Sequence, residues 1–208
     1  MSMNKTAIVF MADGMEMCEC LITVDILRRA KVNVITASVM GRKEVRSSHQ
    51  VIIYADVLAE EVDFDKADII ILPGGRAGTE NLAESDIVQL QCRAFARTDG
   101  KYLAAICAAP SVPAALGILD GKKATCHPDF EEKVLAGSSI NDMDVNSDGK
   151  LDIVPLVDLT HDSVTADGNI ITGQGLGATM DFALYIAEIL TGKDTADAIA
   201  SSVCYRYR

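Results

Sequence analysis

The 208-residue sequence predicts an α/β fold, in which a doubly wound, mostly parallel sheet is sandwiched by helices. The alternation of two patterns along the chain supports this prediction. Short apolar, β-branched runs alternate with stretches of helical periodicity. Strands that alternate with helices in this way pair in parallel through right-handed crossovers. The sequence also shows no internal repeat and no linker rich in Pro, Ser or Gly. A single domain over residues 1–208 is therefore expected.

Six apolar runs are predicted to form the strands. The run Ile69–Leu72 contains no polar spacer, which is typical of a strand buried on both faces of a parallel sheet. The sequence Pro73-Gly74-Gly75 follows it and stops the strand. The predicted strands are residues 7–11, 32–39, 51–54, 69–72, 102–106 and 170–172.

Three helices have apolar residues at helical spacing. The first ends near Ala30 and is predicted to bury Cys20, Val24 and Leu27. The second is capped by Ser85 and ends at Gly100, and its predicted buried residues are Ile87, Leu90, Ala94 and Phe95. The third is stopped by Gly192, and its predicted buried residues are Phe182, Tyr185, Ile186, Ile189 and Leu190.

The composition excludes several classes of partner. A net charge of −11 argues against binding to nucleic acid or to an anionic membrane surface, because both require clustered Lys and Arg. No run approaches the ~20 apolar residues that span a bilayer, and no targeting segment is visible, so a cytoplasmic location is expected. The six cysteines include no Cys-x-x-Cys pair, which argues against a zinc ribbon or a thioredoxin-type redox pair.

The segment around Cys107 carries the clearest chemical prediction. A buried strand runs directly into Cys107, and small residues and then Pro110 follow, as a sharp turn from a strand into a helix requires. A nucleophile at such an elbow is exposed at the edge of the sheet. The positive end of a helix dipole favours a thiolate there. A buried, unreactive cysteine at a tight turn is the alternative.

The elbow segment, residues 105–110, resembles the signature of the ThiJ/PfpI superfamily. Within it, the sequence is most similar to the branch that contains the Parkinson-associated protein deglycase and its bacterial relatives. The similarity runs nearly end to end through several separated motifs in the same order. These motifs are Glu19 six residues before Asp25, Ile71-Leu72-Pro73-Gly74-Gly75, Asn81-Leu82, His127-Pro128, Gly173-Gln174-Gly175 and Asp181-Phe182-Ala183-Leu184.

This resemblance implies a flavodoxin-like fold, a homodimer and a set of residue roles. Cys107 would be the nucleophile, Glu19 a buried acid hydrogen-bonded to its sulfur, and His127 a proton shuttle. Gly75 and Ala108 would direct backbone N–H groups at an oxyanion. Without the resemblance, Glu16 would be as good a candidate as Glu19, and a lone histidine is more often structural than catalytic.

The implied function is a glyoxalase that needs neither a cofactor nor glutathione. It would convert methylglyoxal-like dicarbonyls to hydroxy acids through a hemithioacetal on Cys107, and removal of early glycation adducts (deglycase activity) is a variant of this chemistry. The alternative is an oxidative-stress sensor or holding chaperone, in which Cys107 is oxidised to a sulfinate without turnover. The peptidase activity of more distant relatives is less expected, because residue 108 is alanine, not histidine.

A loop of about residues 138–165 is expected to be an insertion relative to the family. It contains the front half of an EF-hand-type calcium loop, in which oxygen-bearing side chains alternate before a glycine. The twelfth position is Pro155 in place of a bidentate Glu, so an acidic turn held by Asx hydrogen bonds is an alternative to calcium. The candidate calcium ligands are Asp144, Asn146, Asp148 and Asp152.

Overall fold

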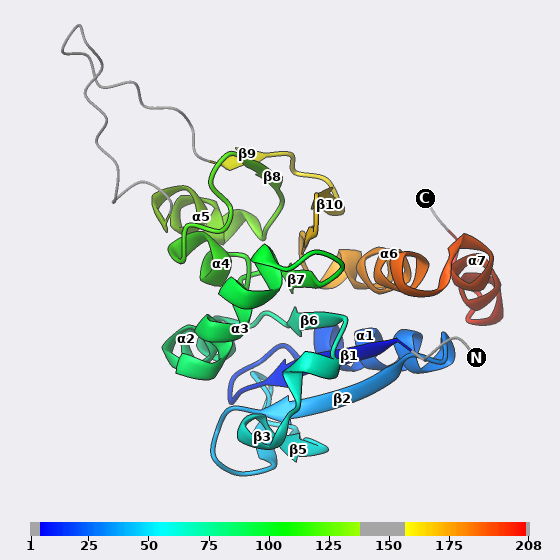
Figure 1. Ribbon diagram of the computed structural model, residues 1–208, viewed down its shortest axis with the longest axis horizontal. Helices are drawn as coiled ribbons and strands as arrows, with labels where there is room; N and C mark the ends of the chain where they lie inside the picture. Colours follow the sequence, from blue (N-terminus) through cyan, green and yellow to red (C-terminus); the bar gives the residue numbers. More distant parts are fainter. Residues whose placement is uncertain (1–4, 138–156, 207–208) are drawn as a thin grey trace, which may run out of the picture.

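The computed structural model describes residues 5–137 and 157–206. Its centre is a seven-stranded sheet in the order β10-β11-β7-β6-β1-β2-β5 (Figure 1). Every neighbouring pair in it is parallel except β10 with β11. The predicted α/β fold is confirmed. The strands of this sheet are β1 (Thr6–Met11), β2 (Asn33–Ser38), β5 (Val57–Leu58), β6 (Ile69–Leu72), β7 (Tyr102–Ile106), β10 (Val164–Asp167) and β11 (Ile170–Gly173).

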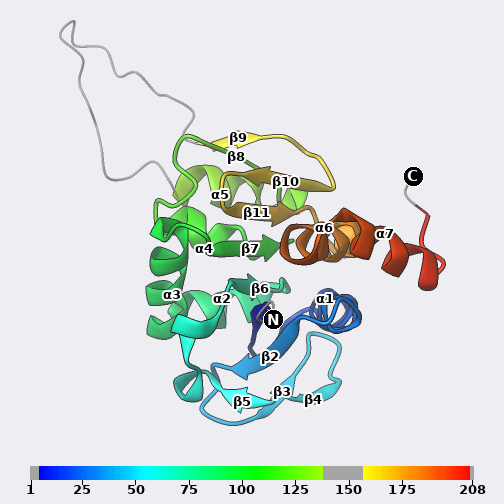
Figure 2. The same cartoon turned by 45° about the vertical axis from the view of Figure 1, so that its right-hand side comes forward.

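Helices cover both faces of the sheet, as Figures 1 and 2 show from two directions. One face packs against α1 (Met17–Arg29), α6 (Thr179–Thr191) and α7 (Lys193–Ser202). The other packs against α2 (Arg76–Glu84), α3 (Asp86–Arg97), α4 (Ser111–Ala115) and α5 (Glu131–Gly137). Short 3-10 turns are η1 (Ala59–Glu61), η2 (Phe64–Lys66), η3 (Pro128–Phe130) and η4 (Leu176–Ala178). None of the described helices is long and apolar enough to cross a bilayer.

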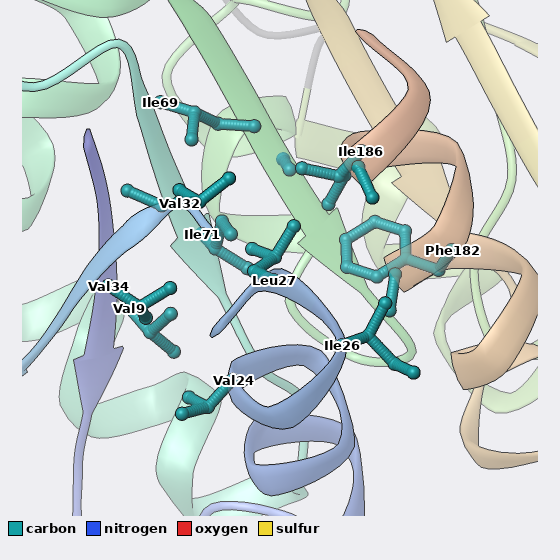
Figure 3. Close-up of a cluster of buried hydrophobic side chains, with 14 of the residues drawn as sticks. Val9, Val24, Ile26, Leu27, Val32, Val34, Ile69, Ile71, Phe182 and Ile186 are labelled. Carbon is teal, nitrogen blue, oxygen red and sulfur yellow. The ribbon is translucent and has the colours of Figure 1, made fainter. Parts of the chain in front are cut away.

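Alternate residues of the central strands fill two separate cores. In β1, Val9 packs under α1 and α6, whereas its neighbours Ile8 and Phe10 pack under the helices of the opposite face. Figure 3 shows the first of these cores, where Leu27 of α1 and Phe182 of α6 meet the strands. Burial on both faces explains why the central strands are continuously apolar.

The predicted buried face of α3 is right at Phe95 and partly right at Ile87, which is half-buried, but it is wrong at Leu90 and Ala94. The structure buries Val88, Cys92 and Phe95, while Leu90 is 62% exposed and Ala94 is also exposed. The buried residues are spaced i, i+4, i+7 from Val88, and a buried face at these positions leaves Leu90 on the solvent side of the helix. In α6 the prediction holds except at Tyr185, which is 36% exposed, and at Ile189, which is half-buried.

Two further segments differ from the sequence-based prediction. The predicted strand 51–54 forms as β4 (Ile52–Tyr54), but it pairs with β3 (Glu44–Arg46) in an antiparallel hairpin outside the main sheet. Part of the expected loop 138–165 is strand, because β9 (Val157–Leu159) pairs with β8 (Lys122–Ala124) and β10 begins at Val164. The four candidate calcium ligands lie outside the described residues.

Candidate active site

The carboxyl ends of β6, β7 and β11 meet at one edge of the sheet, next to the start of α1. An open pocket of about 620 Å³ lies there. In a doubly wound sheet this edge is where ligands bind. The pocket is lined by Glu16, Glu19, Gly75, Cys107, His127, Pro128, Ser163, Gln174, Gly175, Leu176, Gly177 and Ala178.

Cys107 follows β7 in a strained backbone conformation, with φ of 66°. Non-glycine residues rarely adopt this left-handed conformation, and the strain is found mainly at functional sites. Two backbone hydrogen bonds of 2.9 Å hold it: Cys107 N–H donates to the carbonyl of Gly173, and His127 N–H donates to the carbonyl of Cys107. The predicted strand-to-helix elbow is present, although α4 begins only at Ser111.

Glu19 lies in the first turn of α1 and is 1% exposed. Its Oε2 accepts a hydrogen bond of 2.9 Å from the backbone N–H of Gly74. Its Oε1 is buried and has no hydrogen-bond partner of ordinary geometry in the described part of the chain. The carboxyl group as a whole interacts with the Cys107 thiol. Burial raises the pKa of Glu19 to about 7, although hydrogen bonds with Cys107 and Gly74 lower it.

Glu19 and Cys107 form a coupled acid pair. Burial and the neighbouring Glu19 carboxylate raise the pKa of the Cys107 thiol to about 12, whereas the backbone N–H groups of Gly75 and Ala108 lower it. The charge repulsion by which Glu19 raises the pKa of the Cys107 thiol disappears when Glu19 holds a proton. Because two adjacent groups resist a double negative charge, we expect the pair to share one proton near neutral pH.

His127 lies on the loop after β8, with 43% of its side chain exposed. Its Nδ1 accepts a hydrogen bond of 3.2 Å from the backbone N–H of Asp129, so the neutral ring carries its proton on Nε2. Gly175 lies between this ring and the nucleophile: a Cβ there would be 3.5 Å from His127 Cδ2 and 3.9 Å from Cys107 Sγ. A side chain at position 175 would therefore enter the space beside the sulfur.

The structure thus brings all five predicted residues (Cys107, Glu19, His127, Gly75 and Ala108) into contact with one another or with the pocket. It also separates the two glutamates. Glu19 is buried behind the sulfur, while Glu16 is the N-cap of α1 and lies nearer the mouth.

Sequence reasoning assigned no pocket role to Ser163, Gln174 or Leu176, although all three line the cavity. For Gln174 a signal was present, because it follows a predicted strand and lies within a motif shared with the family. In the described residues no group of three or more His, Cys, Asp or Glu side chains could hold a metal ion.

Comparisons with known proteins identify the family of the chain. Residues 5–189 match the model of the DJ-1/PfpI family. The chain is 35% identical over 205 residues to Protein dj-1beta of Drosophila melanogaster, covering 99% of this chain and 100% of that protein. The crystal structure of that protein superposes with a TM-score of 0.85, and the same 99% and 100% of the two chains are covered.

Two further relatives have informative names. A structure named Toxoplasma gondii DJ-1, oxidized, is 30% identical with a TM-score of 0.81, covering 98% of this chain and 100% of that one. The glutathione-independent glyoxalase DJR-1.2 of Caenorhabditis elegans is 27% identical over 205 residues, covering 98% of each chain.

Proposed function

The chain belongs to the DJ-1/PfpI family, and we propose that it is a glyoxalase that acts on small dicarbonyls without a cofactor or glutathione. The observation that carries this proposal is the pairing of a buried carboxyl, Glu19, with the strained thiol Cys107 under two backbone N–H donors. A relative in the same family has the name of a glutathione-independent glyoxalase. Methylglyoxal is the reference substrate.

The first step is addition of the Cys107 thiolate to the aldehyde carbon of the dicarbonyl. A C–S bond forms, the C=O π bond breaks, and the resulting oxyanion takes a proton to give a hemithioacetal. The N–H groups of Gly75 and Ala108, which point at the sulfur, stabilise the thiolate before the attack. Glu19, whose proton is retained up to about pH 7, is the nearest acid to the nucleophile.

The second step moves hydrogen between the two carbons. A base removes the proton from C1 of the hemithioacetal, an enediol forms, and C2 is reprotonated, so that C1 is oxidised and C2 is reduced within one molecule. Water then hydrolyses the resulting thioester, which releases lactate and regenerates the thiol. We assign the proton transfers to Glu19, which interacts with the Cys107 thiol, and to His127, whose ring lines the same pocket.

Lactate formation from methylglyoxal by reduced protein, measured without glutathione, tests this proposal. Saturable turnover in the wild type is expected. Cys107→Ser and Glu19→Gln should each lose at least 100-fold in kcat/KM, since general acid–base and nucleophilic roles contribute on the order of 10²–10⁴. His127→Gln should also lose activity, and His161→Gln, at a histidine that is 62% exposed and outside the pocket lining, is its matched control. No turnover by the reduced wild type would contradict the proposal.

Release of early glycation adducts is a finer variant of this proposal. Deglycase activity requires direct attack on the carbonyl of an adduct. A glyoxalase that removes only free dicarbonyl also lowers adduct levels, so adduct levels alone do not distinguish the two activities. Release of amine from a purified, dicarbonyl-free adduct by the wild type, absent in Cys107→Ser, would support it.

A second candidate is an oxidation sensor, and it is favoured by the unpartnered Oε1 of Glu19. Peroxide would oxidise the Cys107 thiolate to a sulfinate in two steps, each releasing water. A protonated Glu19 could then donate to a sulfinate oxygen. Oxidation of Cys107 at low peroxide in the absence of dicarbonyl turnover, measured by intact mass, would favour this role.

We also propose that the chain forms a homodimer in the reducing cytosol. Four large apolar side chains are exposed on the helix α1 and on the β3–β4 hairpin beside it, an arrangement that marks an interaction surface. They are Leu21, Val51, Ile52 and Tyr54.

A further inference from the structure

Glu16 is a fixed charge at the active-site pocket. Its carboxylate caps α1, accepting from the backbone N–H of Cys18 at 3.2 Å and from the Ser48 hydroxyl at 3.3 Å. The side chain is only 15% exposed. These hydrogen bonds hold the carboxylate in place, so its negative charge lines the pocket beside the nucleophile.

Within one chain, no Lys or Arg side chain of the described residues offsets this charge inside the pocket. The described lining residues include no Lys or Arg. Among the described residues, the only basic side chain paired with Glu16 within 4.0 Å is the His49 ring at 3.7 Å, and that ring is 72% exposed. Arg46 and Arg76 line a different pocket.

The rest of the pocket also disfavours an anionic ligand. Once the Glu19–Cys107 pair has lost the proton that creates the nucleophile, it carries a further negative charge. Pro128, Leu176 and Ala178 add apolar side chains to the lining, beside the uncharged polar side chains of Ser163 and Gln174. An anionic substituent placed there would face two negative charges.

We infer that Glu16 determines the charge selectivity of this pocket, so that it admits neutral dicarbonyls with a short apolar substituent and rejects dicarbonyls that carry a carboxylate or phosphate. The substrate class rests on the proposed function, whereas the charge selectivity at Cys107 does not. Glu16 is a specificity residue in this account, and it takes no part in the proton transfers.

Alkylation of Cys107 tests the inference without any need for turnover. The thiolate displaces iodide from iodoacetamide, which is neutral, or from iodoacetate, which is anionic, and the two reagents are of similar size. The rate of each reaction at Cys107 is followed by peptide mass, which separates Cys107 from the exposed Cys204. The ratio of the two rates measures the charge that a small ligand meets at the sulfur.

Glu16→Gln keeps the shape and the capping oxygen but removes the charge. We expect the iodoacetamide-to-iodoacetate ratio to fall about fivefold in this variant, the effect of one unit charge several ångströms away in a solvent-open site. Glu60→Gln, on the exposed turn η1, is the matched control and should retain the wild-type ratio. Equal ratios in the wild type and Glu16→Gln would overturn the inference.

A second arm separates this inference from the proposed function. The two substrates are 2-oxopentanal, which is neutral, and 4,5-dioxopentanoate, which has a similar chain ending in a carboxylate. The wild type should turn over 2-oxopentanal in strong preference to 4,5-dioxopentanoate. Glu16→Gln should reduce that preference. A shifted alkylation ratio with no turnover of either compound would overturn the glyoxalase proposal and leave the charge selectivity standing. An unchanged alkylation ratio in Glu16→Gln, with normal dicarbonyl turnover, would overturn the charge selectivity and leave the glyoxalase proposal standing.

Discussion

Gly74 and Glu19 are in direct contact: the N–H of Gly74 donates to Glu19 Oε2 at 2.9 Å. A Cβ at Gly74 would fall 2.6 Å from that oxygen and 2.6 Å from Cys107 Cβ. Position 74 is therefore restricted to glycine by the approach of the acid and the nucleophile, which both press against its backbone.

Gly74→Ala should displace Glu19 from Cys107. Because the new methyl group also meets the backbone carbonyl of Ile106 at 2.9 Å, relaxation requires movement of the strand end. We expect a loss of about 1–3 kcal/mol in the free energy of unfolding and a loss of most Cys107 reactivity. Urea denaturation and the rate of Cys107 alkylation measure the two effects, and a variant with wild-type values for both would contradict the contact.

The raised pKa of Glu19 predicts a specific dependence of stability on pH. The pKa rises from an ordinary value of 4.5 to about 7 in the folded state. The native chain therefore binds more protons than the unfolded chain between these values, and stability falls as the pH rises through this window. The contribution is on the order of 3 kcal/mol at about 1.4 kcal/mol per pKa unit.

Glu19→Gln should remove this dependence, because the amide does not titrate and can still accept from Gly74. Denaturation of the wild type and the variant at pH 4.5 and at pH 7.5 tests it: the wild type should lose more stability than Glu19→Gln over that range. Parallel losses in the two proteins would show that Glu19 is not the group responsible.

The positive φ of Cys107 predicts a difference between two inactive variants. Both Cys107→Ala and Cys107→Gly remove the thiol, but only glycine adopts a φ of 66° without strain. We expect Cys107→Gly to be the more stable of the two by about 1 kcal/mol, despite the greater flexibility of its unfolded chain. Thermal melts measured side by side give the comparison, and a more stable Cys107→Ala would argue that the elbow is unstrained.

The proposed dimer surface predicts which apolar side chain sets the oligomeric state. Leu21 of α1 is 41% exposed, and Leu90 of α3 is 62% exposed on a helix that packs on the other face of the sheet. Leu21→Glu should convert the dimer to a monomer, whereas Leu90→Glu should leave the mass in solution unchanged. Size-exclusion chromatography with light scattering distinguishes them; a monomeric wild type, or a dimeric Leu21→Glu, would refute the assignment.

The sequence predicted the parts of the fold that local pattern determines. The run Ile69–Leu72 is buried on both faces, so its apolar character identified it without further information. β10 was not predicted, because this four-residue antiparallel edge strand carries polar side chains and has no apolar run of its own. The buried face of α3 was misassigned because Leu90 and Val88 are equally apolar, and only packing against the sheet selects between them.

The candidate site could be predicted only in part from local sequence. The elbow at Cys107 is a local feature, since a buried strand, small residues and a proline follow one another directly. Glu19, His127 and Gly175 come from three distant segments, and no periodicity reports the distances between them. Resemblance to a family supplied Glu19 and His127, while the closeness of Gly175 to both His127 and Cys107 became visible only in the folded chain.

The two backbone hydrogen bonds of Cys107 have a consequence for the proposed reaction. They join the nucleophile on one side to Gly173, at the end of β11, and on the other to His127. A fluctuation that separates the backbone of Cys107 from that of His127 must therefore break a main-chain hydrogen bond at the sheet edge. The same pairing that holds β7 to β11 therefore fixes the backbone of the proposed nucleophile before a substrate arrives.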